Sequence, residues 1–322
     1  MNINQTLKQY FGYDSLRTGQ EELINGILAG HDVLGIMPTG AGKSLCYQLP
    51  ALILKGITLV ISPLISLMSD QVKALNQAGV HAAYINSSLT ENQIRMALSY
   101  ASQGRYKIIY VAPERLNTPR FLDFACNADI SMLTVDEAHC ISQWGQDFRP
   151  SYLEIAGFLT RLPRRPIVSA FTATATERVK NDIVASLELN NPVTMVTGFD
   201  RPNLFFRVVT RKGGSQKDNS IINYEKKHED ESGIIYCATK KNVDKLYTLL
   251  NEQGISAGRY HAGLSNDERK QNQEDFTYDR IRVMVATNAF GMGIDKSNVR
   301  YVLHYNMPQS LEYYYQEAGA RR

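Results

Sequence analysis

The residues best suited to chemistry form a glycine-bearing segment that runs from Met37 to Ser44. It follows the apolar run Val33–Ile36, which predicts a buried strand, and it precedes residues typical of a helix start. The backbone N–H groups of such a loop and helix start point toward one place and attract an anion. We therefore expect a nucleotide-phosphate site in which Lys43 reaches the β- and γ-phosphates and the Ser44 hydroxyl ligates Mg²⁺. The predicted phosphate-binding residues are Thr39, Gly40, Ala41, Gly42, Lys43 and Ser44.

One departure from the phosphate-loop pattern leaves an alternative open. Met37 stands where the pattern G-x-x-x-x-G-K-[ST] has its first glycine. An ordinary glycine-rich turn that contains Gly-Lys-Ser by chance is therefore the competing interpretation. The next motif along the chain favours the phosphate loop.

A pair of carboxylates, Asp136 and Glu137, ends the apolar run Met132–Val135. Asp136 can hold Mg²⁺ through its water shell, and Glu137 can orient and deprotonate the water that attacks the γ-phosphate. A solvent-exposed acidic strand end is the alternative. Together the two motifs predict a nucleoside triphosphatase with Lys43, Asp136 and Glu137 as catalytic residues. Its metal ligands would be Ser44 and Asp136.

The composition is that of a globular protein, with 322 residues of which 43% are hydrophobic and 21% charged. The length predicts two domains, and a net charge of +3 permits a nucleic-acid partner without requiring one. No apolar run approaches the length of a membrane helix, and the N-terminus lacks a signal-peptide pattern. We expect a cytoplasmic protein with no membrane partner. The four cysteines lack zinc-ligand spacing, so we expect reduced thiols and no zinc: Cys46, Cys126, Cys140 and Cys237.

Apolar, β-branched runs alternate with helix-like stretches along the whole chain. This alternation predicts an α/β fold with mainly parallel sheets covered by helices on both faces. Polar residues collect at the ends of the runs, at the sheet edge where ligands bind. A junction near Gly198–Pro202 predicts domains over residues 1–200 and 201–322. After Val33–Ile36, the predicted strands are Ile57–Ile61, Lys107–Ala112, Met132–Val135, Ile167–Phe171, Gly233–Cys237, Ile281–Ala286 and Val299–His304.

The order of motifs resembles that of superfamily 2 helicases, and specifically the RecQ family of DNA helicases. The most specific stretch is Ala138–Pro150, which is similar to the aromatic-rich loop that follows the DEAH box in this family. The resemblance covers nearly the whole chain. Further matching stretches are Phe11–Tyr13, Ser62–Met68, Ala112–Leu116, Tyr260–Leu264, Ala286–Asp295 and Gln316–Gly319.

The resemblance implies two RecA-like domains that use ATP and Mg²⁺ to translocate 3′ to 5′ on single-stranded DNA, in DNA repair and recombination. The implied partners are single-stranded and forked DNA, with single-strand-binding or repair proteins as possible partners. The implied location is the cytoplasm of a bacterial-type cell, at the nucleoid. Relatives of this kind continue into zinc-binding and winged-helix regions, and we expect this chain to contain the helicase core alone.

The resemblance also implies roles for residues beyond the two motifs. Those implied to contact the nucleotide are Tyr13, Arg17, Gln20, Gly293 and Asp295. Those implied to bind DNA or couple binding to hydrolysis are Ser62, Arg115, His139, Gln143, Trp144, Phe148, Arg149, Thr174 and His261. Structural alternatives remain open: Tyr13 as a core residue, Thr174 as a helix cap and Trp144 as the plug of a small satellite core.

The C-terminal end departs from the family's sixth motif, Gln-Glu-x-Gly-Arg-Ala-Gly-Arg. After Gln316–Gly319 the chain reads Ala320, Arg321 and Arg322. Arg321 or Arg322 is expected to supply the arginine finger that stabilises charge on the transferring phosphoryl group. Three alternatives follow: another superfamily 2 motor such as an RNA helicase, an ATP-binding nucleic-acid clamp with impaired hydrolysis, and a P-loop kinase. A kinase would leave the second half of the chain unexplained.

Overall fold

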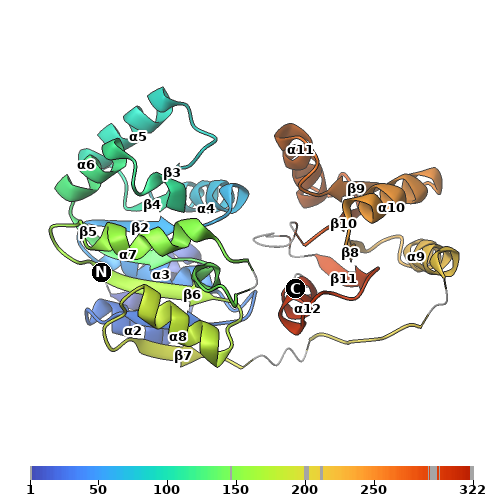
Figure 1. Ribbon diagram of the computed structural model, residues 1–322, viewed down its shortest axis with the longest axis horizontal. Coiled ribbons are helices and arrows are strands. Elements are labelled where there is room, and N and C mark those ends of the chain that lie inside the picture. Colours follow the sequence, from blue (N-terminus) through green and yellow to red (C-terminus); the bar gives the residue numbers. More distant parts are fainter. Residues whose placement is uncertain are drawn as a thin grey trace. The chain divides into compact units, whose positions relative to one another are not determined.

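The computed structural model describes residues 2–145, 147–198, 203–210, 213–288, 290, 296 and 298–319 (Figure 1). The chain divides into two compact units, Met1–Phe199 and Asp200–Arg322, and each is considered by itself. No helix in these described ranges is long and apolar enough to cross a membrane.

The first unit is built on a seven-stranded sheet whose order is β3-β4-β2-β5-β6-β1-β7, with every recorded pairing parallel. Parallel pairing brings the carboxyl ends of all seven strands to one edge. The strands are β1 Val33–Ile36, β2 Ile57–Ile61, β3 Ala82–Ile85, β4 Ile108–Val111, β5 Ile130–Val135, β6 Ile167–Thr172 and β7 Val193–Val196.

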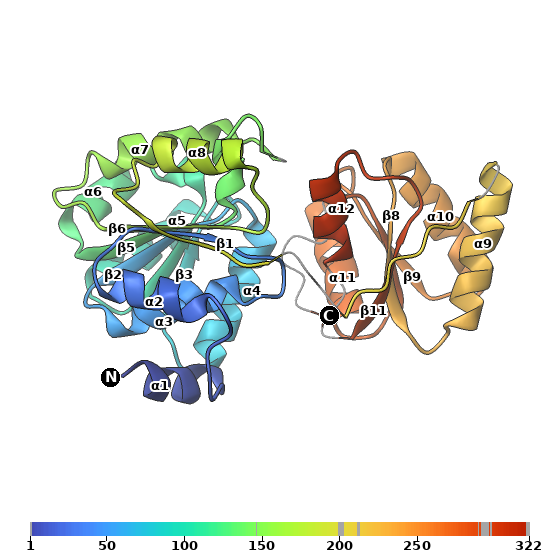
Figure 2. The same cartoon turned by 90° about the horizontal axis from the view of Figure 1, so that it is seen from below.

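Helices cover both faces of this sheet because its strands are apolar on both sides. In β2, Leu59 and Ile61 pack into the core under α5 to α8, whereas Val60 packs into the opposite core under α2 to α4. Figure 2 shows these two layers. The helical segments are α1 Ile3–Thr6, η1 Leu7–Phe11, α2 Gln20–Leu28, α3 Lys43–Ile53, α4 Ile65–Gln77, α5 Glu91–Ser102, η2 Pro113–Arg115, α6 Pro119–Asn127, η3 Ala138–Ile141, η4 Pro150–Leu153, α7 Glu154–Leu159 and α8 Glu177–Ser186.

The second unit repeats the plan on a smaller scale, with a parallel sheet of order β11-β8-β10-β9. Apolar residues of α9 and α10 pack on one face, and Phe276 of α11 packs on the other. The elements are α9 Gly214–Lys227, β8 Ser232–Tyr236, α10 Lys240–Glu252, β9 Ala257–Tyr260, α11 Asn266–Thr277, β10 Val283–Ala286, β11 Val299–His304 and α12 Leu311–Ala318.

The expected α/β class, with mainly parallel sheets flanked by helices, is confirmed. The predicted strands occur with shifts of one or two residues at their ends. Three strands were not predicted, namely β3, β7 and β9, and each lies at an edge of its sheet.

Candidate nucleotide and nucleic-acid site

The predicted motifs of the first unit follow neighbouring strands at one sheet edge. The phosphate loop follows β1, Thr174 follows β6, the acid pair follows β5 and Ser62 follows β2. Backbone hydrogen bonds extend the strand pairing into these loops, because the Met37 N–H donates to the Thr172 carbonyl (2.9 Å) and the Asp136 N–H to the Ile61 carbonyl (2.8 Å). The sheet therefore brings together motifs that lie far apart in sequence.

The phosphate loop has the backbone shape that its glycines permit. Gly40 and Gly42 have φ angles of 84° and 83°, and Gly42 is the N-cap of α3, which begins at Lys43. A Cβ atom on Gly42 would lie 2.5 Å from Nε2 of Gln20, so a side chain here would displace the Gln20 amide and would also be strained by the positive φ angle. The Lys43 ammonium donates to the Met37 carbonyl at 3.2 Å. Thr39, Ala41 and Ser44 complete the loop and the first turn of α3.

Gln20 and Arg17 both bind this loop. The buried Gln20 carboxamide donates to the Ala41 and Gly42 carbonyls, each at 3.2 Å, and accepts from the Arg17 N–H at 2.8 Å. The Arg17 guanidinium donates to the Gly40 carbonyl at 2.6 Å. Both polar ends of the Gln20 side chain thus bond the chain's own backbone. Tyr13 is 52% exposed, which contradicts the alternative that it is a core residue.

Asp136 and Glu137 are both buried, which contradicts the alternative of a solvent-exposed strand end. Burial, followed by the neighbouring charge of Glu137, raises the pKa of Asp136 to about 7, against the opposing effect of Lys43. Burial also acts to raise the pKa of Glu137, but contact with His139 and the charge of Lys43 outweigh it and lower that pKa to about 2. The Lys43 ammonium therefore lies within electrostatic range of both carboxylates.

The buried imidazole of His139 connects the acid pair to the segment after β6. Its Nδ1 lies 2.9 Å from the Thr172 hydroxyl and 3.3 Å from Oε2 of Glu137. The Thr172 hydroxyl donates its own proton to the Thr174 carbonyl (3.0 Å), so Nδ1 of His139 must carry hydrogen and donate to Thr172. Among the described residues, buried Oε2 of Glu137 has no aligned hydrogen-bond donor. One carboxylate oxygen of the acid pair thus keeps a free acceptor position.

The candidate DNA contact Thr174 and the nearby Thr176 have different surroundings. Thr174 is buried, and Thr176 is the N-cap of α8, where its hydroxyl accepts from the Val179 N–H at 3.3 Å. The helix-cap interpretation therefore holds for Thr176 and not for Thr174.

The loop after the DEAH stretch presents its tryptophan to solvent. Trp144 is 61% exposed, which contradicts the alternative that it plugs a satellite core. The base of the loop is fixed, because the Ser142 hydroxyl donates to Asp182 of α8 (2.5 Å) and accepts from the Trp144 N–H (3.1 Å). A Cβ atom on Gly145 would lie 2.1 Å from the His139 carbonyl oxygen, so the loop packs directly on the backbone of His139.

The other predicted loop residues have different surroundings. Gln143 is exposed and Phe148 is half-buried. The Arg149 guanidinium donates to Asp147 at 2.9 and 2.7 Å and to the Pro63 carbonyl at 2.7 Å. Arg149 thereby ties the loop to the segment after β2. Contact of Arg149 with a nucleic-acid phosphate stays a prediction.

Two further predicted contacts also have protein surroundings. The Ser62 side chain is fully buried and, within the described residues, its hydroxyl has no hydrogen-bond partner. Contact of that hydroxyl with a DNA phosphate stays a prediction, and it would require the side chain to become accessible. Arg115 is half-buried, and its guanidinium lies 3.9 Å from Glu91 of α5.

In the second unit, His261 is buried at the end of β9. Its Nδ1 accepts from the Gly263 N–H (3.1 Å), so Nε2 carries the hydrogen and donates to Asp244 (3.1 Å). Both ring nitrogens are engaged within the unit, and the predicted DNA contact would need this side chain to rearrange. Gly293, Asp295, Arg321 and Arg322 lie outside the described residues.

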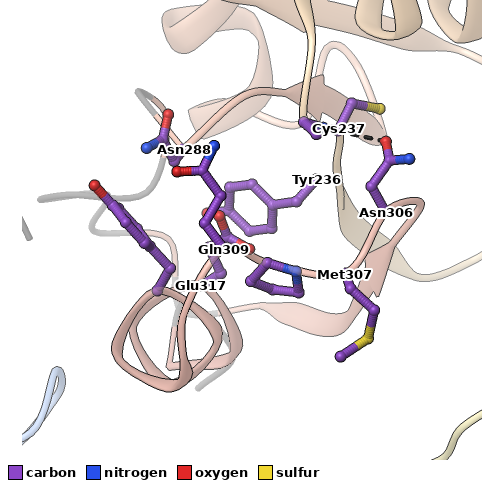
Figure 3. Close-up of a pocket in the computed structure, with 10 residues that line it drawn as sticks. Tyr236, Cys237, Asn288, Asn306, Met307, Gln309 and Glu317 are labelled. Atoms are coloured by element: carbon purple, nitrogen blue, oxygen red, sulfur yellow. Dashed lines mark hydrogen bonds between the residues drawn. The ribbon is translucent and has the colours of Figure 1, made fainter.

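A small pocket of about 60 Å³ lies in the second unit where β8 and β11 end (Figure 3). Asn288 and Glu317 both line it, so the stretches Ala286–Asp295 and Gln316–Gly319 approach each other there. The buried Tyr236 hydroxyl also lines the pocket and, among the described residues, has no hydrogen-bond partner. Burial, and secondarily the charge of Glu317, raises the pKa of Tyr236.

Two residues of α8 that contact the aromatic loop were missed by sequence reasoning, Arg178 and Asp182. The guanidinium carbon of Arg178 lies 3.6 Å from the centre of the Trp144 ring. Asp182 lies 40 residues after its partner Ser142, Arg178 likewise comes from a helix well beyond the loop, and no local pattern marks them. In the described ranges, no group of three or more His, Cys, Asp or Glu residues could hold a metal ion.

A parallel α/β unit with a phosphate loop and a buried acid pair at its carboxyl edge, followed by a second, smaller parallel α/β unit, defines a helicase-type triphosphatase core. The family model described as DEAD/DEAH box helicase matches residues 17–183, more than half of the chain. The helicase conserved C-terminal domain matches residues 216–320. The chain belongs to the DEAD/DEAH box helicases, as a helicase core of RecQ type.

The similarity to curated relatives extends along nearly all of the chain. It is 50% identical over 314 residues to ATP-dependent DNA helicase RecQ of Bacillus subtilis (strain 168), covering 97% of this chain and 53% of that protein. It is 45% identical to ATP-dependent DNA helicase RecQ of Pasteurella multocida (strain Pm70), covering 97% and 49%. The chain thus spans about half the length of these relatives.

The fold is shared with solved helicase structures. S. cerevisiae Dbp5 bound to RNA and ADP BeF3 superimposes with a TM-score of 0.80, covering 98% of this chain and 83% of that chain. The sequence identity is 20%, so this likeness concerns the fold alone. It supports the expectation of two RecA-like domains.

Proposed function

We propose that this chain hydrolyses ATP and couples hydrolysis to 3′-to-5′ movement along single-stranded DNA. The observation that carries the proposal is the contact between a buried acid pair and an exposed aromatic loop. His139 touches Glu137 through its ring, and its backbone carbonyl packs against Gly145 beside Trp144. Catalytic and nucleic-acid-facing residues are thereby contiguous. We propose DNA as the nucleic acid because the RecQ relatives are named as DNA helicases.

The first unit fits the triphosphate of ATP. The α3 N-terminus and the turns at Gly40 and Gly42 supply N–H groups for phosphate oxygens, and Lys43 supplies a positive charge. To bind a phosphate, the Lys43 ammonium would exchange the Met37 carbonyl for a phosphate oxygen. The Ser44 hydroxyl and the Asp136 carboxylate are oxygen ligands of the kind that Mg²⁺ prefers. Bound Mg²⁺ would neutralise charge that develops on the β- and γ-phosphates.

Glu137 is the proposed base. Its unpartnered Oε2 is free to accept a hydrogen bond from the attacking water and to take its proton. His139 holds this carboxylate beside the Thr172–Thr174 segment, so a displacement of either neighbour would misplace the base. The proposed route from DNA to hydrolysis runs from Trp144 through Gly145 and His139 to Glu137.

The remaining assignments follow the family pattern. We propose that Tyr13, Arg17, Gln20, Gly293 and Asp295 contact the nucleotide and that Arg321 or Arg322 supplies the arginine finger. To contact adenine, the Gln20 amide would have to give up at least one of its hydrogen bonds to the Ala41 and Gly42 carbonyls of the phosphate loop. Gln143 and Phe148 are proposed to contact DNA beside Trp144. The cellular role proposed is repair and recombination of DNA in the cytoplasm of a bacterial-type cell.

Steady-state ATP hydrolysis tests this function, measured with no nucleic acid, with single-stranded DNA and with single-stranded RNA. We expect DNA-stimulated turnover that Lys43→Ala abolishes, and loss of stimulation alone in Trp144→Ala. Stronger stimulation by RNA would identify an RNA-dependent motor instead. ATP binding without turnover would identify a nucleic-acid clamp.

A further inference from the structure

Helix α8 places an arginine against the only tryptophan of the chain. The Arg178 guanidinium carbon lies 3.6 Å from the centre of the Trp144 ring, which is the geometry of a cation–π contact. The indole is nevertheless 61% exposed. With the guanidinium over one face of the ring, more than half of the surface of Trp144 still faces solvent.

We propose that Arg178 is a positioning residue that braces Trp144 as a preformed stacking platform for an unpaired base of single-stranded DNA. The base takes the open face of the indole while the guanidinium supports the other face. This inference rests on the proposed function, because it names how that function's nucleic acid is held. Aromatic platforms of this kind bind unpaired bases with little regard to sequence, since every base has a π-face.

The root of the loop is fixed to the same helix. Asp182, one turn along α8 from Arg178, accepts from the Ser142 hydroxyl at 2.5 Å, and that hydroxyl in turn accepts from the Trp144 N–H. Helix α8 therefore holds both the backbone and the side chain of Trp144. A side chain already held in its binding position loses less conformational freedom when a ligand arrives.

The position of Arg178 within α8 supports a role outside the helix. Helix α8 begins at Glu177, with Thr176 as its N-cap, so Arg178 is the second helical residue. The partial positive charge of a helix N-terminus disfavours a cation there. Stabilisation of α8 therefore does not account for an arginine at this position, whereas the contact with Trp144 does.

The test compares Arg178→Ala and Arg178→Lys with Lys180→Ala, which removes one positive charge from the same helix. Binding of a labelled oligothymidylate is measured together with acrylamide quenching of Trp144 fluorescence, which has no contribution from another tryptophan. We expect Arg178→Ala to weaken binding by about 2- to 5-fold, the factor that an exposed cation–π contact represents. Arg178→Lys should restore part of the affinity, and Lys180→Ala should bind as the parent does. Acrylamide should reach Trp144 more readily in Arg178→Ala.

A second probe separates bracing from direct phosphate contact. An abasic oligonucleotide of equal length should bind parent and Arg178→Ala alike, and the salt dependence of oligothymidylate binding should keep its slope. If Arg178→Ala reduces the slope of log affinity against log salt concentration by about 0.7, the guanidinium binds a phosphate, and the positioning role is wrong. If Arg178→Ala binds oligothymidylate and is quenched by acrylamide as the parent is, the proposal that Arg178 positions Trp144 is also wrong. Absence of DNA-stimulated hydrolysis in the parent would refute the proposed function. Oligothymidylate binding and Trp144 quenching would still show whether Arg178 positions Trp144.

Discussion

Replacing Gly145 with alanine is the sharpest test of contact between the aromatic loop and the catalytic acids. The new Cβ atom would lie 2.1 Å from the His139 carbonyl oxygen, whereas close carbon–oxygen contacts in proteins are about 3.3 Å. Loop and carbonyl must therefore separate by about 1 Å. Because the obstacle is a backbone atom, no rotation of a side chain relieves the collision.

The separation has two measurable consequences. If the loop stays docked, the strain lowers the free energy of unfolding of the first unit by about 1–3 kcal/mol. If the loop lifts away, Trp144 and His139 move apart, and DNA stimulation of ATP hydrolysis falls while basal hydrolysis persists. Urea unfolding followed by circular dichroism and DNA-stimulated ATP hydrolysis measure the two effects.

Gly157→Ala is the matched control in the same unit. Gly157 lies within α7, and an added Cβ atom would meet nothing within 4 Å. We expect this change to stabilise the helix by about 0.5–1 kcal/mol, because alanine is the better helix former, and to leave hydrolysis unchanged. A Gly145→Ala chain with the unfolding curve and DNA-stimulated turnover of the parent would refute the contact between loop and catalytic centre.

Three further predictions follow from the described geometry. Lys43→Ala should reduce ATP hydrolysis by about 10²-fold or more, as expected for a charge aimed at the reacting phosphates, and should leave the free energy of unfolding unchanged. Near-normal turnover would exclude the phosphate-loop role. Arg282→Met should destabilise the second unit by about 3–5 kcal/mol, because it removes the cation 3.0 Å from the fully buried Glu225 carboxylate and leaves the neutral Tyr301 hydroxyl as a donor to it. Adding Glu225→Gln should recover much of the loss in urea unfolding. Burial acts to raise the pKa of Asp244, but hydrogen bonds from His261 and a neighbouring arginine outweigh it and lower that pKa. A carboxylate with a lowered folded-state pKa stabilises the fold above its unfolded pKa of about 3.9, so the second unit should lose this stability as acid takes the pH below that value. Asp244→Asn should flatten that part of the pH–stability curve.

The sequence predicted every central strand and the edge strand β11, but it missed the other three edge strands, β3, β7 and β9, for a physical reason. Central strands of a parallel sheet are buried on both faces and read as continuous apolar runs, as in Ile57–Ile61. The edge strand β9, Ala257–Tyr260, contains a glycine and an arginine, and β7 alternates between half-buried and exposed residues. Strands that pair on one side only need less apolar surface, so their sequences carry a weaker signal.

The candidate site likewise contains residues that the sequence could predict and residues that it could not. Motif spacing located the phosphate loop and the acid pair, since that chemistry depends on residues adjacent in sequence. It could not show that Arg149 also binds its own protein, through Asp147 and the Pro63 carbonyl. Nor could it find Arg178, because only the folded packing of α8 beside the loop brings that residue to Trp144.

Contacts at both ends of the aromatic loop bear on its proposed coupling role. Arg149 ties its far end to Pro63 after β2, while α8 holds Ser142 at its near end. Both anchors come from elements that border the strand carrying the acid pair. A base that stacks on Trp144 would therefore push on a segment fixed at both ends. In the proposed coupling route, this push would pass through Gly145 to the His139 backbone, whose imidazole lies against Glu137.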